Sequence, residues 1–276
     1  MAAIELAPHH KQGLSLRNPV MTACGCFGYG VEYGQLVEVA RLGAVVTSPV
    51  SLRPRRGAVQ PRLVETAAGF VLTTGDQNPG VRRVIERYAG AWARLGVPVV
   101  AHLAPDEPAA AARTALALAS TGAVAGLELD VPASGSPAEA SAAVRAALES
   151  ELPLLVRLPL ARAAELAAAC AEWGADALVV GAPPPGAARH PSGALVSGSL
   201  YGPAVHALAL AALLEVRRRV EVPLIGCGGV HTPDDGRAFL DAGAAAIQLD
   251  SVLFADPSAA ARLAGAGVFQ VGTCIS

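Results

Sequence analysis

Several short apolar runs in this sequence end in residues that can do chemistry. In chain order, the residues at their ends are Cys24, Ser48, His102, Asp130, Arg157, Gly181, Cys227 and Asp250. The imidazole of His102 and the carboxylates of Asp130 and Asp250 are groups that bind metals or transfer protons. The cysteines of this set, together with Cys26, add thiols. If the runs are parallel strands, these side chains meet at one end of the sheet and form a reactive rim.

The same residues also allow a purely structural interpretation. Asp130 and Arg157 end neighbouring runs and could form an ion pair, while His102 could be a hydrogen-bonded core histidine. The Cys-x-Cys pair at 24–26 has no second pair at a matching spacing, which makes it a weak metal signal and favours small buried side chains. Both interpretations of the rim stay open, and no metal site is predicted.

The elements that must position this rim follow from the alternation of apolar runs and alanine-rich stretches. Strands are predicted at 19–24, 44–48, 98–103, 126–130, 153–158, 176–181, 223–228 and 245–250. Helices are predicted at 32–41, 80–94, 107–121, 137–150, 162–173, 203–220, 233–242 and 257–264. The continuous apolar runs are typical of buried parallel strands. Eight such units predict a TIM (β/α)8 barrel as a single domain over residues 1–276, in preference to a doubly wound open sheet.

Two longer segments interrupt this regular pattern. Residues 49–79 follow the second predicted strand, and residues 182–202 follow the sixth. Both are predicted to be insertions on the face where TIM-barrel active sites are built. The four arginines within 53–62 could bind an anionic ligand or a partner, and a solvated loop is the alternative.

Composition limits the partners and the compartment. A net charge of −2 gives no electrostatic reason to expect nucleic acid or an anionic membrane as a partner. The start, MAAIELAPHHKQG, lacks the apolar segment of a signal peptide, and no uninterrupted apolar run is long enough to cross a membrane. Five cysteines, an odd number, favour a reduced, cytoplasmic protein.

Four segments in order resemble the flavin-containing, two-subunit class of the dihydroorotate dehydrogenase family. They are NPVMTACGCFGYGVEY, PRLVETAAGFVLTTGDQNPGV, SGSLYGPAVHALAL and VPLIGCGGVHTPDD. The resemblance implies a barrel with FMN across its carboxyl-terminal mouth and a cysteine base that deprotonates dihydroorotate while hydride passes to the flavin. It also implies a homodimer or a complex with an electron-transfer subunit, in a family that serves pyrimidine biosynthesis. Gln77 and Asn78 keep the family's Q-N-P-G and are the substrate-binding residues it implies.

The stretch ELDVPASG departs from the family's E-L-N-x-S-C-P-N at every reactive position. Ala133 stands in place of the cysteine base and cannot accept a proton, and Asp130 and Gly135 replace two asparagines. Ser134 becomes a candidate base only if the loop shifts by one residue; His102 and Asp130 are the other candidates. Further polar substrate contacts of the family fall on Leu72, Ala182 and Pro183. Dihydroorotate oxidation is therefore not expected.

The resemblance also assigns residues to the flavin. These are Ala23, Cys24, Ser48, Arg157, Gly228, Gly229, Asp250 and Ser251, with Ser48 and Arg157 in place of family lysines. The amides of Gly228 and Gly229 suit a phosphate. Asp250-Ser251 replaces the family's Gly-Thr, and a carboxylate about 4 Å from a phosphate is repelled by ~4 kcal/mol at an effective dielectric near 20. FMN is the cofactor implied by resemblance, and Asp250 argues for its loss.

Three functions remain open. The first is a diverged FMN-dependent oxidoreductase that acts on another substrate or acts weakly. The second is a non-catalytic scaffold or partner subunit, and the third is a repurposed mouth that binds a metal or a small ligand. The missing base, asparagines and lysines favour the last two, which makes the chain a pseudoenzyme with respect to the family's reaction.

Overall fold

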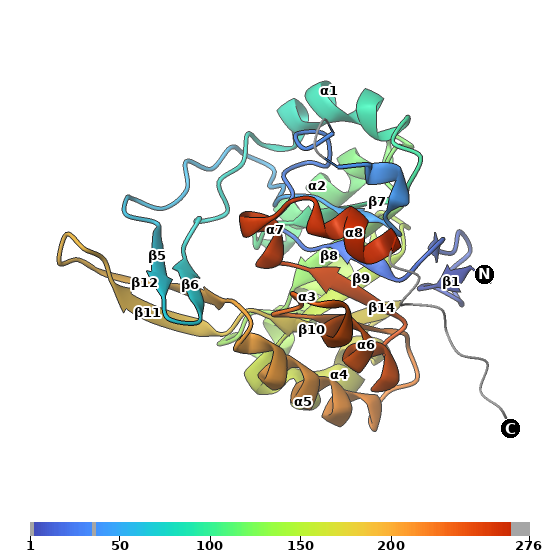
Figure 1. The fold of residues 1–276 in the computed structure, drawn as a ribbon. Coiled ribbons are helices and arrows are strands. Elements are labelled where there is room, and N and C mark those ends of the chain that lie inside the picture. The colour runs from blue at the N-terminus through green and yellow to red at the C-terminus, as the bar shows by residue number, and fades with distance from the viewer. Residues whose placement is uncertain (1–2, 35–36, 266–276) are drawn as a thin grey trace, which may run out of the picture.

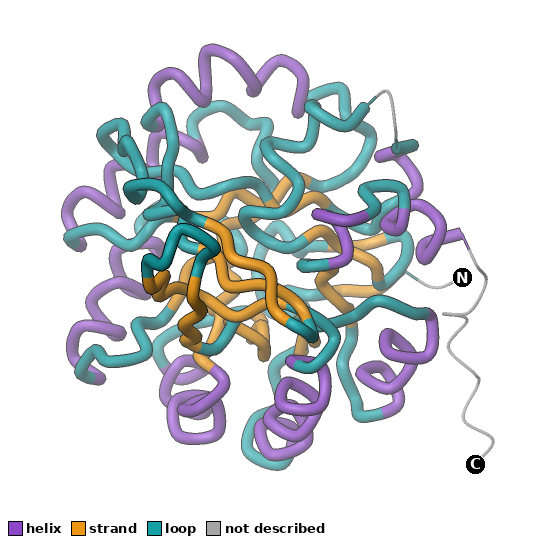
Figure 2. Tube along the Cα trace, turned by 60° about the vertical axis from the view of Figure 1, so that its left-hand side comes forward, coloured by secondary structure: helices purple, strands orange, loops and turns teal. Residues whose placement is uncertain are grey.

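A computed structural model describes residues 3–34 and 37–265, and its centre is a closed ring of parallel strands (Figures 1 and 2). In chain order the strands are β3 (Val20–Thr22), β4 (Val45–Val46), β7 (Val99–Leu103), β8 (Gly126–Asp130), β9 (Leu154–Pro159), β10 (Ala177–Ala182), β13 (Leu224–Cys227) and β14 (Ala246–Leu249). They pair in the order β3-β14-β13-β10-β9-β8-β7-β4, and a parallel bridge between Met21 and Ala44 links β3 to β4. The predicted TIM (β/α)8 barrel is confirmed.

Helices surround this barrel, as Figure 2 shows. They are α1 (Val81–Trp92), α2 (Pro108–Ala119), α3 (Pro137–Leu148), α4 (Ala163–Glu172), α5 (Val205–Arg217), α6 (Pro233–Asp241), α7 (Val252–Ala255) and α8 (Ala259–Gly265), with 3-10 turns η1 (Val39–Arg41) and η2 (Leu160–Arg162). No helix in the described ranges is long and apolar enough to cross a membrane. Seven of the predicted helices match α1 to α6 and α8 within a few residues.

The helix predicted at 32–41 is wrong. The described residues of that stretch form turns and the short η1, while residues 35–36 lie outside the description. Glu32 explains part of the difference, because its carboxylate accepts hydrogen bonds from the backbone N–H groups of Tyr29 and Val31 at 2.8 and 3.2 Å. Such local side-chain bonds hold the backbone in turns and compete with a helix.

Two helices that follow mouth-forming strands begin at well-defined caps. Ser136 and Glu139 form a capping box at the start of α3, and Thr232 and Asp235 form one at the start of α6. Each box satisfies backbone N–H groups that a helix start leaves without partners. The two loops that leave β8 and β13 are therefore fixed where they enter their helices.

The two insertions meet in one antiparallel sheet beside the carboxyl-terminal mouth. The first supplies β5 (Leu63–Thr66) and β6 (Gly69–Leu72), and the second supplies β11 (Pro185–Arg189) and β12 (Leu195–Tyr201). The order β11-β12-β6-β5 joins the insertions through β12 and β6, which Figure 1 shows projecting on the left. At the opposite end lies a small hairpin of β1 (Ile4–Glu5) and β2 (Ser15–Leu16). The insertions were predicted, but their mutual pairing was not.

Glycine allows the two insertions to approach closely. Gly69 has a φ of +147°, and a Cβ atom on it would lie 1.9 Å from the carbonyl oxygen of Tyr201. We expect Gly69→Ala to lower the free energy of unfolding by about 1–3 kcal/mol, the usual effect of overpacking. Urea titration followed by circular dichroism measures this change.

The matched control is Gly90→Ala inside α1. A Cβ atom there would come no closer than 3.8 Å to Arg94 Nη1, and alanine in a helix is favoured over glycine by about 1 kcal/mol. The control should therefore be neutral or stabilising. Equal destabilisation by both substitutions would contradict the close packing of the two insertions.

Candidate functional site

A cavity of about 350 Å³ lies between the barrel mouth and the sheet of the insertions. Its wall includes Cys24, Leu72, Asp76, His102, Asp130, Ala133, Arg157, Ala182, Pro183, Ser199 and Tyr201. Residues of the predicted rim and of both insertions therefore line the same cavity. Its volume lies within the size range of small-molecule sites.

His102 is held inside the barrel by two carboxylates. Its side chain is 2% exposed, with Nδ1 2.9 Å from Glu128 Oε1 and Nε2 3.9 Å from Asp130 Oδ2. The other Glu128 oxygen accepts from Gln248 Nε2 at 2.5 Å, and both of these residues are fully buried. His102 is therefore a buried, hydrogen-bonded side chain that also lines the mouth cavity. Sequence reasoning missed Glu128 and Gln248, whose only signal is one polar residue inside each apolar strand.

These contacts set the protonation of the imidazole. Burial alone lowers the pKa of His102, but the charge of Asp130 and the hydrogen bonds with Cys24 and Glu128 outweigh it and raise the pKa well above its ordinary value. The carboxylates that face both ring nitrogens therefore favour the protonated imidazole. A general base must be able to accept a proton at the working pH, so His102 is poorly suited to replace the missing cysteine.

Asp130 and Arg157 form a bidentate ion pair across the register partners of β8 and β9. Arg157 Nε lies 2.5 Å from Asp130 Oδ1, and Nη2 lies 2.8 Å from Oδ2. Burial raises the pKa of Asp130, but Arg157 and His102 lower it more, and the net shift is downward. The ion-pair interpretation is confirmed, and both Asp130 oxygens are engaged in it. In the described chain, no three His, Cys, Asp or Glu side chains form a group suited to a metal.

At the ends of β13 and β14, backbone amides converge on Asp250. Asp250 Oδ1 accepts from Gly229 N at 3.3 Å, from Ser251 N, and from Ser251 Oγ at 3.0 Å. Ser251 Oγ also lies 2.9 Å from His231 Nε2. The carboxylate is only 3% exposed, and burial raises its pKa. Gly228 precedes this arrangement with a φ of +115°.

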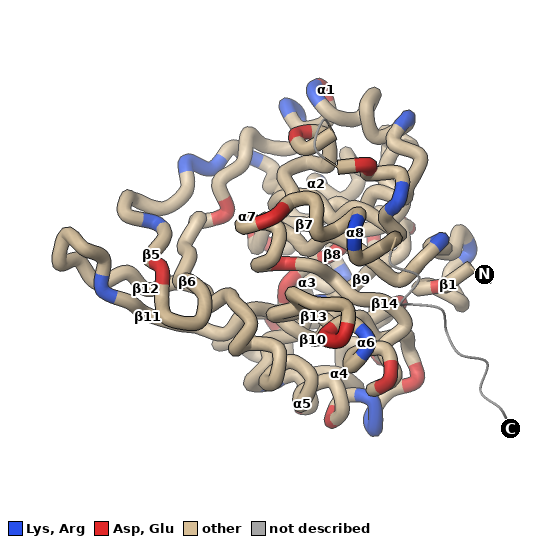
Figure 3. Tube along the Cα trace, in the orientation of Figure 1, with Lys and Arg blue, Asp and Glu red and all other residues tan. Residues whose placement is uncertain are grey.

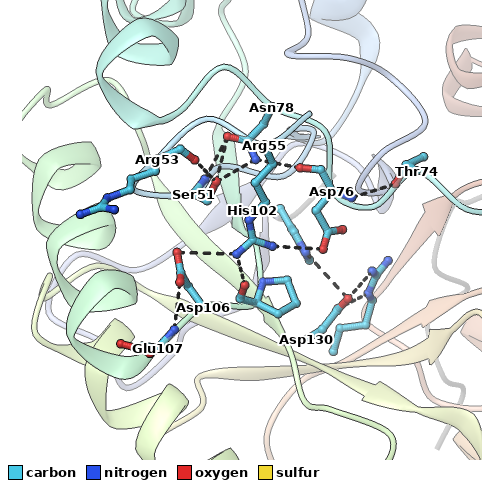
Figure 4. Close-up of polar contacts among 12 residues, drawn as sticks. Ser51, Arg53, Arg55, Thr74, Asp76, Asn78, His102, Asp106, Glu107 and Asp130 are labelled. Carbon is cyan, nitrogen blue, oxygen red and sulfur yellow. Dashed lines mark hydrogen bonds and ion pairs between the residues drawn. The ribbon is translucent and has the colours of Figure 1, made fainter. Parts of the chain in front are cut away.

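The other predicted site residues are divided among neighbouring spaces. Ser134 lies in a separate groove of about 510 Å³ beside α2 and α3, and it is Ala133 that reaches the mouth cavity. Ser48, Gln77 and Asn78 line a third cavity of about 480 Å³. Asn78 Oδ1 accepts from Ser51 Oγ at 3.1 Å (Figure 4). It also accepts from Gly80 N at 2.9 Å, so the Asn78 amide is already used to hold a loop.

Two arginines of the first insertion, Arg55 and Arg62, have local partners. Arg55 pairs with Asp76 at 3.4 Å and with Asp106 at 3.6 Å (Figure 4). Arg62 donates to Gln77 Oε1 and to the carbonyl oxygen of Ala58, both at 2.5 Å. Figure 3 shows the basic residues of this loop and of α1 along the upper edge of the molecule. Arg55 and Arg62 therefore stabilise the loop itself.

The thiols of the rim are buried. Cys24, Cys26 and Cys227 are free cysteines, and burial raises the pKa of each. Ala23, also assigned to the flavin, is 1% exposed and donates its backbone N–H to Leu249 O at 2.8 Å. A raised thiol pKa favours the protonated form, which is a weak nucleophile.

The (β/α)8 barrel, with the sheet of the two insertions beside its mouth, places this chain in a known class of folds. A solved structure, DHODH of Eimeria tenella in complex with ferulenol, superposes with a TM-score of 0.77 over 96% of this chain and 86% of that chain, at 15% identity. That likeness shows the same barrel fold.

Sequence comparison then gives the family. The pattern described as dihydroorotate dehydrogenase matches residues 9–126 and 186–266. Catalytic subunits of dihydroorotate dehydrogenase B (NAD(+)) are similar: the one from Pelobacter propionicus is 37% identical over 91% of this chain and 89% of its own. The one from Geobacter sulfurreducens is 36% identical over 91% and 88%. This chain belongs to the dihydroorotate dehydrogenase family.

The family match is interrupted at an informative place. Residues 127–185 lie between the two matched ranges, and they contain Asp130, Ala133 and Arg157. These residues build one side of the mouth, whereas Leu72 and Asp250, which also depart from the family's residues, lie within the matched ranges.

The flavin that the family implies does not fit this mouth as folded. The amides of Gly229 and Ser251, which suit a phosphate, both donate to the Asp250 carboxylate. Arg157, which takes the place of a family lysine, is committed to Asp130. A phosphate would have to displace a buried carboxylate and approach its charge.

Stability should depend on pH through His102. In the unfolded chain a histidine loses its proton near pH 6.5, whereas the folded pKa of His102 lies well above that value. Its contribution is complete below about pH 6.5 and is lost as pH rises toward the folded pKa, by up to about 1.4 kcal/mol per pH unit. We expect His102→Gln to flatten this slope, measured by urea unfolding between about pH 6.5 and 8.5.

His9→Gln is the matched control, because His9 is exposed. It should keep the slope of the unaltered protein. A His102→Gln variant whose stability falls with pH as steeply as the control would show that the imidazole is neutral in the folded state.

Proposed function

We propose that this chain is a dihydroorotate dehydrogenase family barrel that no longer oxidises dihydroorotate. The observation that carries the proposal is Ala133 in the wall of the mouth cavity, at the position of the family's cysteine base. An alanine methyl group cannot take a proton. The polar groups that share the cavity wall include His102, whose pKa is raised by its neighbours, and Asp130, which is paired with Arg157, and neither is free to act as the base.

Loss of substrate recognition supports the same proposal. Leu72, Ala182 and Pro183 line the cavity where the family pattern has asparagine and threonine. A pyrimidine ring placed there would leave polar groups without partners, at about 1–3 kcal/mol for each group. Gln77 and Asn78, the retained family residues, are assigned to substrate by resemblance alone, and their side chains bond to Arg62 and Ser51.

The chain then acts as a scaffold or partner subunit, within one domain that spans residues 1–276. The relatives are named catalytic subunits, which supports assembly with another subunit; a homodimer and a cytoplasmic location are further parts of the proposal. A small-ligand role for the mouth is the second candidate. The 350 Å³ cavity favours it, because its wall combines the polar side chains of His102, Asp130 and Arg157 with the apolar surface of Leu72 and Tyr201.

The test is orotate binding together with dihydroorotate turnover. Purified protein supplied with excess FMN should not reduce a dye acceptor when dihydroorotate is added. Calorimetric titration with orotate should show no saturable heat, because the cavity lacks partners for the ring. The catalytic subunit of a family relative, assayed in parallel, should be active in both measurements.

Ala133→Cys is the informative variant. It restores the thiol but not the polar groups that hold the ring. We therefore expect its rate of dihydroorotate-dependent dye reduction to stay within about tenfold of the rate without enzyme. Dihydroorotate-dependent dye reduction by the unaltered protein, at a rate comparable to the relative, would contradict the proposal.

A further inference from the structure

The ends of β13 and β14 form an anion-binding site that the chain itself fills. The two strands pair in parallel, with Gly226 opposite Ile247 and Cys227 opposite Gln248. Their carboxyl ends lead directly into the amides of Gly229 and Ser251. Backbone N–H groups that converge in this way make a concavity that attracts anions, phosphate above all.

The anion in this site is the side chain of Asp250. Its Oδ1 receives two backbone N–H groups, one from each strand end, and the Ser251 hydroxyl. His231 adds a further polar contact by holding Ser251 Oγ at 2.9 Å. At 3% exposure, the carboxylate occupies the space that an external anion would need. We propose that Asp250 is a built-in substitute for a bound phosphate monoester and keeps this site closed to phosphate-bearing ligands.

The glycine turn keeps the site in place whatever stands at residue 250. Gly229 has a φ of +65°, and a Cβ atom on it would lie 2.6 Å from His206 N and 2.8 Å from Gly202 O. The backbone is therefore packed against the start of α5 and cannot easily turn its amide away. Removal of the carboxylate leaves the donors of Gly229 and Ser251 in position and without a partner.

This arrangement explains how the mouth folds without a ligand. A buried amide without an acceptor costs about 1–3 kcal/mol, and Asp250 supplies the acceptor within the chain. The same carboxylate repels a phosphate. The inference concerns the occupant of the anion site and does not depend on the loss of dihydroorotate oxidation.

The test compares Asp250→Ala with Asp250→Asn. In the alanine variant the site is empty, so its melting temperature should fall and then rise when inorganic phosphate is added at constant ionic strength. The unaltered protein should show no such rise. Asparagine still offers an oxygen to the amides but carries no charge, so Asp250→Asn should respond less than the alanine variant.

The matched control is Asp234→Ala, which removes an exposed carboxylate near the start of α6. It should behave like the unaltered protein toward phosphate. Titration with FMN extends the test: Asp250→Ala should bind it at least about tenfold more tightly than the unaltered protein, since the removed repulsion of ~4 kcal/mol is worth more than a factor of ten.

Two results would overturn the inference. One is equal stabilisation of the unaltered protein and Asp250→Ala by phosphate; the other is equal affinity of both for FMN. If Asp250→Ala does not fold, the FMN affinity of Asp250→Asn tests the inference instead. Asparagine carries no charge to repel the phosphate, so this variant should bind FMN more tightly than the unaltered protein. Dihydroorotate turnover should stay absent in all of these variants, so failure here is distinguishable from failure of the proposed function.

Discussion

The mouth of this barrel depends on the pairing of buried charges. Arg157 holds both oxygens of Asp130, and His102 lies between Asp130 and Glu128. Removal of one partner from such a buried pair costs about 3–5 kcal/mol, because the other charge is left uncompensated. These side chains come from β7, β8 and β9, so the network ties three barrel strands together at the point where a ligand would enter.

The same pairing limits what the mouth can do. A general base needs a free site for a proton, and a phosphate or a pyrimidine needs donors and acceptors that are not already used. Here the cationic groups face carboxylates of the chain, and the amides of Gly229 and Ser251 face Asp250. Under the proposed function, membership in the dihydroorotate dehydrogenase family describes the fold of this chain, while the polar groups of its mouth pair with one another.

Sequence reasoning predicted the barrel because each strand is a continuous apolar run. It also anticipated the Asp130–Arg157 pair from neighbouring strand ends. It could not predict that β6 pairs with β12, because antiparallel partners so distant in the chain leave no periodic signal. Glu128 and Gln248 were missed for a related reason, since one polar residue in an apolar strand does not reveal its partner. The sequence predicts that Asp250 repels a phosphate, but it does not predict the bonds of Asp250 to backbone amides, which depend on the glycine turn.

The visible absorbance spectrum of the protein as purified tests the central claim most directly. If the charges of the mouth are satisfied within the chain, the protein is isolated without colour, and denaturation releases no flavin into solution. A flavin band that persists through desalting, with close to one equivalent released on unfolding, would contradict the account. It would mean that Asp250 and Arg157 rearrange to admit a cofactor.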